Sequence, residues 1–153
     1  MKEYSKQFIN GEWTNGSDSK KLCNINPYTG EILYEYYSAS VDDINKAFCA
    51  AHDSFELWSC TQPKQKQALL EQLLTVALEM KDDICSCLIE EGGATNFKAN
   101  IEYQNTIDII KQSLNYPYLE NGKILPSNNK GRDNYVVKKP RGVIVVIVPW
   151  NFP

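Results

Sequence analysis

The chain has 153 residues, of which 42% are hydrophobic and 23% charged, and its formal net charge is -3 at pH 7. This composition is typical of a single globular domain and excludes a disordered or fibrous protein. The slightly acidic balance, with lysine and arginine scattered along the chain, also argues against nucleic acid as a partner. No apolar run reaches the roughly 18 residues of a membrane helix and the N-terminus lacks a signal-peptide pattern, so we expect a cytoplasmic protein with no membrane contact.

The first part of the chain predicts small β elements. Residues 8–13 followed by Asn15-Gly16 indicate a short hairpin, because Asn-Gly readily takes the positive φ of a tight turn. Residues 27–30 predict a second turn, followed by a strand up to Tyr37.

The first of several helices is predicted to begin after Ser40, whose side chain can accept hydrogen bonds from the exposed amides of the first turn. We expect it to end near Trp58. Apolar residues recur at spacings of three and four and form one stripe. The stripe consists of Val41, Ile44, Ala47, Phe48, Ala51 and Phe55.

Two further helical stretches follow. Thr61 is a candidate cap and Pro63 suits a first turn, where its missing N–H costs nothing. The long amphipathic run that begins there is expected to break at residues 81–83, because aspartate favours helix starts over helix interiors. The run is expected to end at Gly92-Gly93. Residues 95–114 predict another helix.

The last part of the chain predicts a protruding hairpin and then a buried strand. Residues 121–140 combine turn residues with a strand that carries exposed charge. Residues 143–148 are all β-branched, a pattern typical of a strand buried on both faces at the centre of a parallel sheet. No earlier run has this character, so we expect an α/β fold whose sheet has barely begun and the N-terminal part of a larger protein.

Candidate chemical groups are sparse before the last five residues. The five cysteines are odd in number and irregularly spaced, which indicates reduced thiols, and none has a sequence-evident base. The single histidine, His52, is most simply a half-exposed helix residue, and no metal site is expected. Glu90-Glu91 is most simply a solvated helix end.

Asn151 is the strongest candidate for a catalytic group. It lies between aromatic and proline residues at the carboxyl end of the predicted strand, where open α/β folds bind their ligands. Its amide can donate a hydrogen bond to an oxygen that becomes negative. The alternative is that Asn151 only helps the chain to turn between two prolines.

Several segments together resemble the aldehyde dehydrogenase superfamily. The sequence Pro-Trp-Asn-Phe-Pro at residues 149–153, after a hydrophobic strand, resembles the signature of that family. Residues 8–13 and 26–31 resemble its opening, and residues 91–95 fall where it has a Glu-Thr-Gly-Lys type of turn. The Gly-Gly-Ala-Thr form of this turn and residues 125–127 look most like members that act on benzaldehyde or vanillin.

The resemblance implies the N-terminal part of the aldehyde dehydrogenase fold: small β elements, helices, a protruding β-hairpin and the first strand of a Rossmann-like NAD(P)-binding sheet. Its divisions would be residues 1–120, the N-terminal part of the NAD(P)-binding domain; 121–140, an oligomerisation hairpin; and 141–153, the first core strand with the motif.

The same resemblance implies NAD(P)-dependent oxidation of an aldehyde to a carboxylic acid. Asn151 would hold the oxyanion, and a stretch of four residues would line the cleft for NAD or NADP. That stretch is Ile147, Val148, Pro149 and Trp150. The family's nucleophilic cysteine and general-base glutamate have no counterpart in the chain, so we expect these 153 residues to be inactive by themselves. The alternative is a noncatalytic interaction module whose hairpin pairs with a full-length relative.

Overall fold

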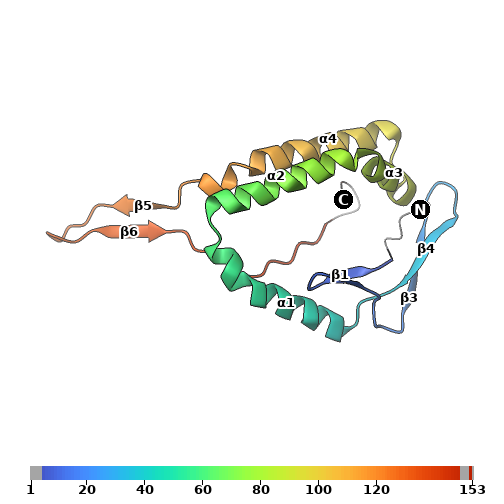
Figure 1. Ribbon diagram of the computed structural model, residues 1–153, viewed down its shortest axis with the longest axis horizontal. Helices are drawn as coiled ribbons and strands as arrows, with labels where there is room; N and C mark the ends of the chain where they lie inside the picture. The colour runs from blue at the N-terminus through green and yellow to red at the C-terminus, as the bar shows by residue number, and fades with distance from the viewer. Residues whose placement is uncertain (1–4, 149–151, 153) are drawn as a thin grey trace.

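The computed structural model describes residues 5–148 and Phe152. These residues form three two-stranded antiparallel sheets, four α-helices and one 3₁₀ turn. The elements are β1 (Gln7–Ile9), β2 (Glu12–Thr14), β3 (Lys21–Ile25), β4 (Ile32–Tyr37), α1 (Val41–Cys60), α2 (Pro63–Glu79), α3 (Lys81–Gly92), α4 (Asn96–Ser113), η1 (Tyr116–Tyr118), β5 (Gly122–Leu125) and β6 (Asn134–Val137). Figure 1 shows an open arrangement, with α1 on one side, α2 to α4 on the other and the β5–β6 hairpin extending away from both.

The turn of the first hairpin is at Asn10-Gly11 and not, as predicted, at Asn15-Gly16. Ile9 pairs with Glu12, which leaves two residues for the turn, and both have positive φ, 51° at Asn10 and 84° at Gly11. Two positive φ values give the tight turn whose twist suits a two-residue hairpin. Both dipeptides suit such a turn locally, and the strand register selects the first.

The second hairpin has the predicted turn at residues 27–30. The Asn26 side chain accepts hydrogen bonds from the backbone N–H groups of Tyr28 and Thr29, at 2.9 and 3.2 Å. The N–H of Gly30, with φ 77°, donates to the Asn26 carbonyl. These bonds satisfy the turn locally, which is why it was predictable from the sequence.

A buried carboxylate joins the first hairpin to α1. As predicted, the Ser40 side chain accepts from the Asp43 N–H at 3.2 Å, and the Asp43 carboxylate accepts in return from the Ser40 N–H at 3.0 Å. The Ser17 N–H and hydroxyl also donate to Asp43, at 2.8 and 2.7 Å. These hydrogen bonds, first those of Ser40 and Ser17, hold the pKa of Asp43 below its ordinary value, so the group is an anion that fixes the chain before β3 to the start of α1.

The boundaries of α2 agree with the sequence except at its cap. Met80 separates α2 from α3, next to the predicted break at residues 81–83, and Gly93 closes α3 in the left-handed conformation at φ 64°. Thr61 ends α1 instead of starting α2, because its hydroxyl donates to the Leu57 carbonyl at 2.9 Å. Gln62 is the residue that caps α2.

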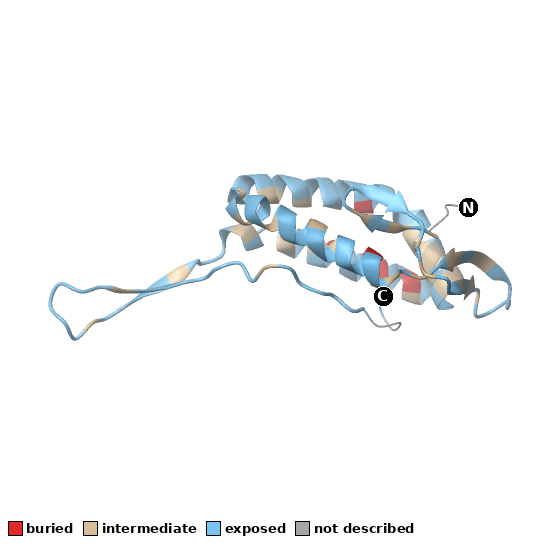
Figure 2. Cartoon of the chain, turned by 90° about the horizontal axis from the view of Figure 1, so that it is seen from below, coloured by how far each residue is buried: buried red, intermediate tan, exposed pale blue. Residues whose placement is uncertain are grey.

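The core lies between α2, α3 and α4. Ala77, Tyr103 and Ile107 are buried there, and the Tyr103 hydroxyl donates to the Ala77 carbonyl at 3.2 Å. Few other described residues are buried, as Figure 2 shows. The predicted apolar stripe of α1 is present but uncovered, with Val41 73% and Phe48 46% exposed.

Candidate functional site

The segment after β6 leads from the hairpin back towards the helices, and in the view of Figure 1 it is drawn between α1 and α2. Its start lies against α1, where Arg141, Gly142 and Val143 line a hollow of about 570 Å³. The α1 side of this hollow is formed by Phe48, Cys49, His52, Asp53 and Phe55. The structure thus brings the segment that leads to the predicted site alongside the first helix.

Residues 143–148 are neither paired nor buried, which differs from the predicted central strand. They belong to no ladder, and their side chains are exposed, Ile147 to 90% and Val148 to 63%. A strand needs a hydrogen-bonded neighbour, and no strand among residues 5–148 pairs with this segment. The sequence pattern indicated burial in a sheet, and the described residues do not provide that sheet.

Of the predicted site residues, Ile147 and Val148 are described, whereas Pro149, Trp150 and Asn151 lie outside the described residues. Phe152, which follows Asn151, is described. Its ring lies under the Lys98 ammonium group, with Nζ 4.8 Å from the ring centroid. The structure therefore places one residue of the five-residue motif against the first turn of α4.

The five cysteines are free thiols, and Cys87, one of the two half-buried ones, is a poor nucleophile. Cys87 donates to Glu91 Oε1 at 3.2 Å. Burial, followed by the hydrogen bond to the negative Glu91, raises the pKa of Cys87 to about 12. Because the thiolate is the reactive form, the Cys87 thiol is unreactive at neutral pH.

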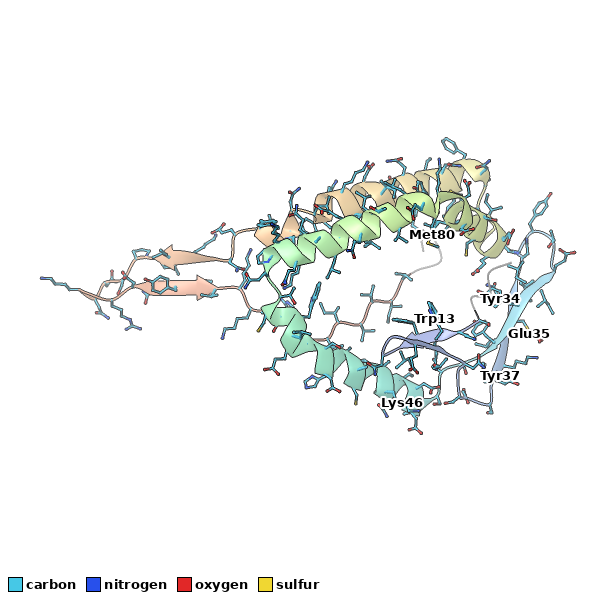
Figure 3. The ribbon with its side chains drawn as sticks, in the orientation of Figure 1. Trp13, Tyr34, Glu35, Tyr37, Lys46 and Met80 are labelled. Carbon is cyan, nitrogen blue, oxygen red and sulfur yellow. The ribbon has the colours of Figure 1, made fainter. Side chains whose placement is uncertain are left out.

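Glu91 is not the freely solvated residue that the sequence suggested. Besides the Cys87 thiol, the Tyr34 hydroxyl donates to Glu91 Oε1, at 3.1 Å. Tyr34 and Glu35, labelled in Figure 3, are neighbours on β4 with opposite environments, Tyr34 half-buried and Glu35 exposed. Burial chiefly raises the pKa of Tyr34, so the hydroxyl keeps its proton and joins β4 to α3. Residues 34 and 91 are far apart in sequence, and no local signal could have predicted this contact.

The described residues provide no metal site, since no three histidine, cysteine, aspartate or glutamate side chains among them gather around a common point. None of the helices in the described ranges has the length and apolar character needed to cross a membrane.

Solved structures of larger proteins contain the fold of this chain. The crystal structure of an NAD-dependent benzaldehyde dehydrogenase from Corynebacterium glutamicum matches with a TM-score of 0.84 and 32% identity, over 88% of this chain and 29% of that one. The chain belongs to the aldehyde dehydrogenase family, whose model matches residues 13–153. The resemblance and the fold class predicted from the sequence are both confirmed.

Curated relatives agree with the family and with its predicted aromatic branch. The chain is 38% identical to a benzaldehyde dehydrogenase of Bacillus subtilis over 99% of its length, and 35% identical to a vanillin dehydrogenase of Corynebacterium glutamicum over 97%. It spans 31% of the length of each of these relatives.

Proposed function

We propose that the chain forms the N-terminal part of an NAD(P)-dependent aldehyde dehydrogenase that oxidises an aldehyde to the carboxylic acid. The observation that carries this proposal is the family match, which extends to residue 153 and so includes the motif with Asn151. Because the chain spans 31% of its relatives, we assign the nucleophilic thiolate and the base for hydrolysis to a longer protein. The noncatalytic alternative is not favoured, since the named relatives are dehydrogenases.

Asn151 is assigned the role of oxyanion donor. When a thiolate attacks the aldehyde carbonyl, negative charge develops on the carbonyl oxygen, and a positioned neutral amide donor stabilises that charge. The carbonyl oxygen carries more negative charge in the transition state than in the bound aldehyde, so the hydrogen bond from the amide stabilises the transition state more than the ground state.

Residues 147–150 are assigned to one wall of the cofactor cleft. Ile147 and Val148 fit this role because their aliphatic side chains are 90% and 63% exposed and can cover one face of a flat ring. Bound NAD or NADP would supply the hydride acceptor. The described residues include no glycine-rich phosphate turn, so their contribution is limited to this wall.

Aromatic aldehydes are the proposed substrate class. Two relatives that match nearly the whole chain are named for benzaldehyde and vanillin.

The uncovered apolar surfaces of α1 and residues 143–148 fit a chain that packs against further protein. We place the protein in the cytoplasm, because all five of its thiols are free.

A hybrid enzyme tests this function. Residues 1–153 would replace the matching segment of the benzaldehyde dehydrogenase of Corynebacterium glutamicum, and NADH formation would be followed by absorbance with benzaldehyde and NAD. We expect the hybrid to be active and the 153-residue chain alone to form no NADH. A folded hybrid that oxidises no aldehyde contradicts the proposal.

The β5–β6 hairpin is proposed to assemble copies of the whole protein. It extends from the body (Figure 1), and Tyr135 and Val137 on one face of β6 are 66% and 63% exposed. Exposed strand edges of this kind recruit partner strands.

Replacing both Tyr135 and Val137 with glutamate is expected to convert an oligomeric hybrid into monomers, because carboxylates would be desolvated at the interface. Sedimentation velocity measures the change. The charge reversal Lys64→Glu on α2 serves as the control and should leave assembly unchanged. An unchanged sedimentation coefficient in the double variant contradicts the role of the hairpin.

A further inference from the structure

A hollow of about 910 Å³ lies at the base of the β5–β6 hairpin, where the hairpin leaves the helices (Figure 1). Its walls come from the junction of α1 and α2, from the end of α4 with η1, and from the first and last residues of the hairpin segment. Four apolar side chains, each about half exposed, line it: Trp58, Leu69, Leu73 and Tyr116. Sites for small molecules have this volume and this predominantly apolar lining.

Hydrogen bonds hold the walls of the hollow in place. The Tyr118 hydroxyl donates to Gln67 Oε1 at 3.0 Å, which ties η1 to α2. At the base of the hairpin, the Lys138 N–H donates to the Asn121 carbonyl at 2.8 Å. The hollow is therefore formed before a ligand enters it, which lowers the free-energy cost of binding.

Two lysines line the hollow, and the described residues contribute no acidic side chain to it. Lys66 is half-buried, with Nζ 5.2 Å from the centroid of the Trp58 ring, and Lys138 is exposed. Neither lysine belongs to a salt bridge with another described residue. Two uncompensated positive charges beside an apolar wall favour a ligand that is both anionic and apolar.

The start of α2 adds to this positive potential. A helix N-terminus carries a partial positive charge, which acidic side chains in the first turn stabilise. The first turn of α2 has no acidic residue, and its first four residues include Lys64 and Lys66 instead. Lysines are disfavoured at this end of a helix, so an anion bound beside Lys66 would offset both the side-chain charge and the helix dipole.

We propose that this hollow binds a carboxylate with an apolar body. The carboxylate pairs with the ammonium group of Lys66 and is attracted by that of Lys138, while the apolar body lies against the ring and leucine side chains of the wall. Aromatic acids and medium-chain fatty acids share this chemistry. The inference goes beyond the proposed function and does not depend on it, because binding can be measured without any reaction.

The first test titrates the 153-residue chain with benzoate and follows the indole N–H signal of Trp58 by NMR. That signal should shift on binding, whereas the indole signal of Trp13 on β2 should not. We expect benzoate to bind about tenfold more tightly than its neutral analogue benzamide, because only the carboxylate forms a charge-assisted hydrogen bond with lysine. Octanoate and octanamide are compared in the same way, and the acid with the lower Kd identifies the body as a ring or an alkyl chain. If both acids bind no better than their amides, the inference is wrong.

A second test uses pairs of neighbouring lysines to locate the site. Lys66→Met and Lys138→Met remove a charge and keep an aliphatic side chain, and Lys66→Met should weaken binding of the preferred acid about tenfold. The matched controls, Lys64→Met and Lys139→Met, change exposed lysines that do not line the hollow and should leave Kd unchanged. Lys66→Arg keeps a cation and should retain most of the affinity, which separates loss of charge from loss of structure. Equal Kd values for Lys66→Met and Lys64→Met, or for Lys138→Met and Lys139→Met, contradict the inference.

Discussion

Replacement of Asn151 by alanine in the hybrid enzyme is expected to lower kcat by about 10² to 10³-fold, the usual effect of removing one oxyanion donor. The substitution leaves the thiolate and the base intact, so the fall in kcat reflects only the missing stabilisation of the charge on the carbonyl oxygen. KM for benzaldehyde is expected to change little, because the interaction strengthens in the transition state.

The matched control for Asn151→Ala is Asn129→Ala near the tip of the hairpin, where the same amide is lost from an exposed residue. That variant should keep the wild-type kcat. An Asn151→Ala hybrid with full kcat would leave only the turn-forming role for this residue and would remove the oxyanion assignment. Measurement of both variants with saturating NAD separates the chemical step from cofactor binding.

The features that the sequence predicted correctly are set by a few neighbouring residues. Ser40 and Asp43 satisfy each other's backbone within one turn, and Asn26 closes its own turn. Gly93 ends α3 because glycine adopts a positive φ without steric cost. Such local hydrogen-bond chemistry is nearly independent of the remaining fold.

The errors occur where two local solutions compete and the tertiary structure selects between them. Asn10-Gly11 and Asn15-Gly16 both suit a tight turn, and only the pairing of Ile9 with Glu12 shows which one is used. Thr61 can cap a following helix or close a preceding one, and its bond to Leu57 decides the matter. The choice depends on tertiary contacts, and the periodicity of the sequence does not specify those contacts.

The candidate site was predictable in its chemistry and not in its contacts. The motif around Asn151 could be read directly from the sequence, because the donor and its neighbours are adjacent residues. The Lys98–Phe152 contact joins residues on different elements, and the burial predicted for residues 143–148 requires a sheet that the described chain does not form. A hydrophobic pattern indicates burial in a complete fold, not in a chain that spans 31% of its relatives' length.

Ile107→Ala is expected to be the most destabilising substitution in the helical layer. Ile107 is 2% exposed between Ala77 and Tyr103, and truncating an isoleucine in such a core costs about 2–5 kcal/mol. Ile109 on the same helix is 60% exposed, so the same change there should cost no more than about 0.5 kcal/mol. Urea unfolding, followed by circular dichroism, compares Ile107→Ala with Ile109→Ala, two variants that have the same amino-acid composition. Because a domain of this size has only about 5–15 kcal/mol of stability, Ile107→Ala should shift the midpoint strongly, and equal midpoints would show that α2, α3 and α4 do not share this core.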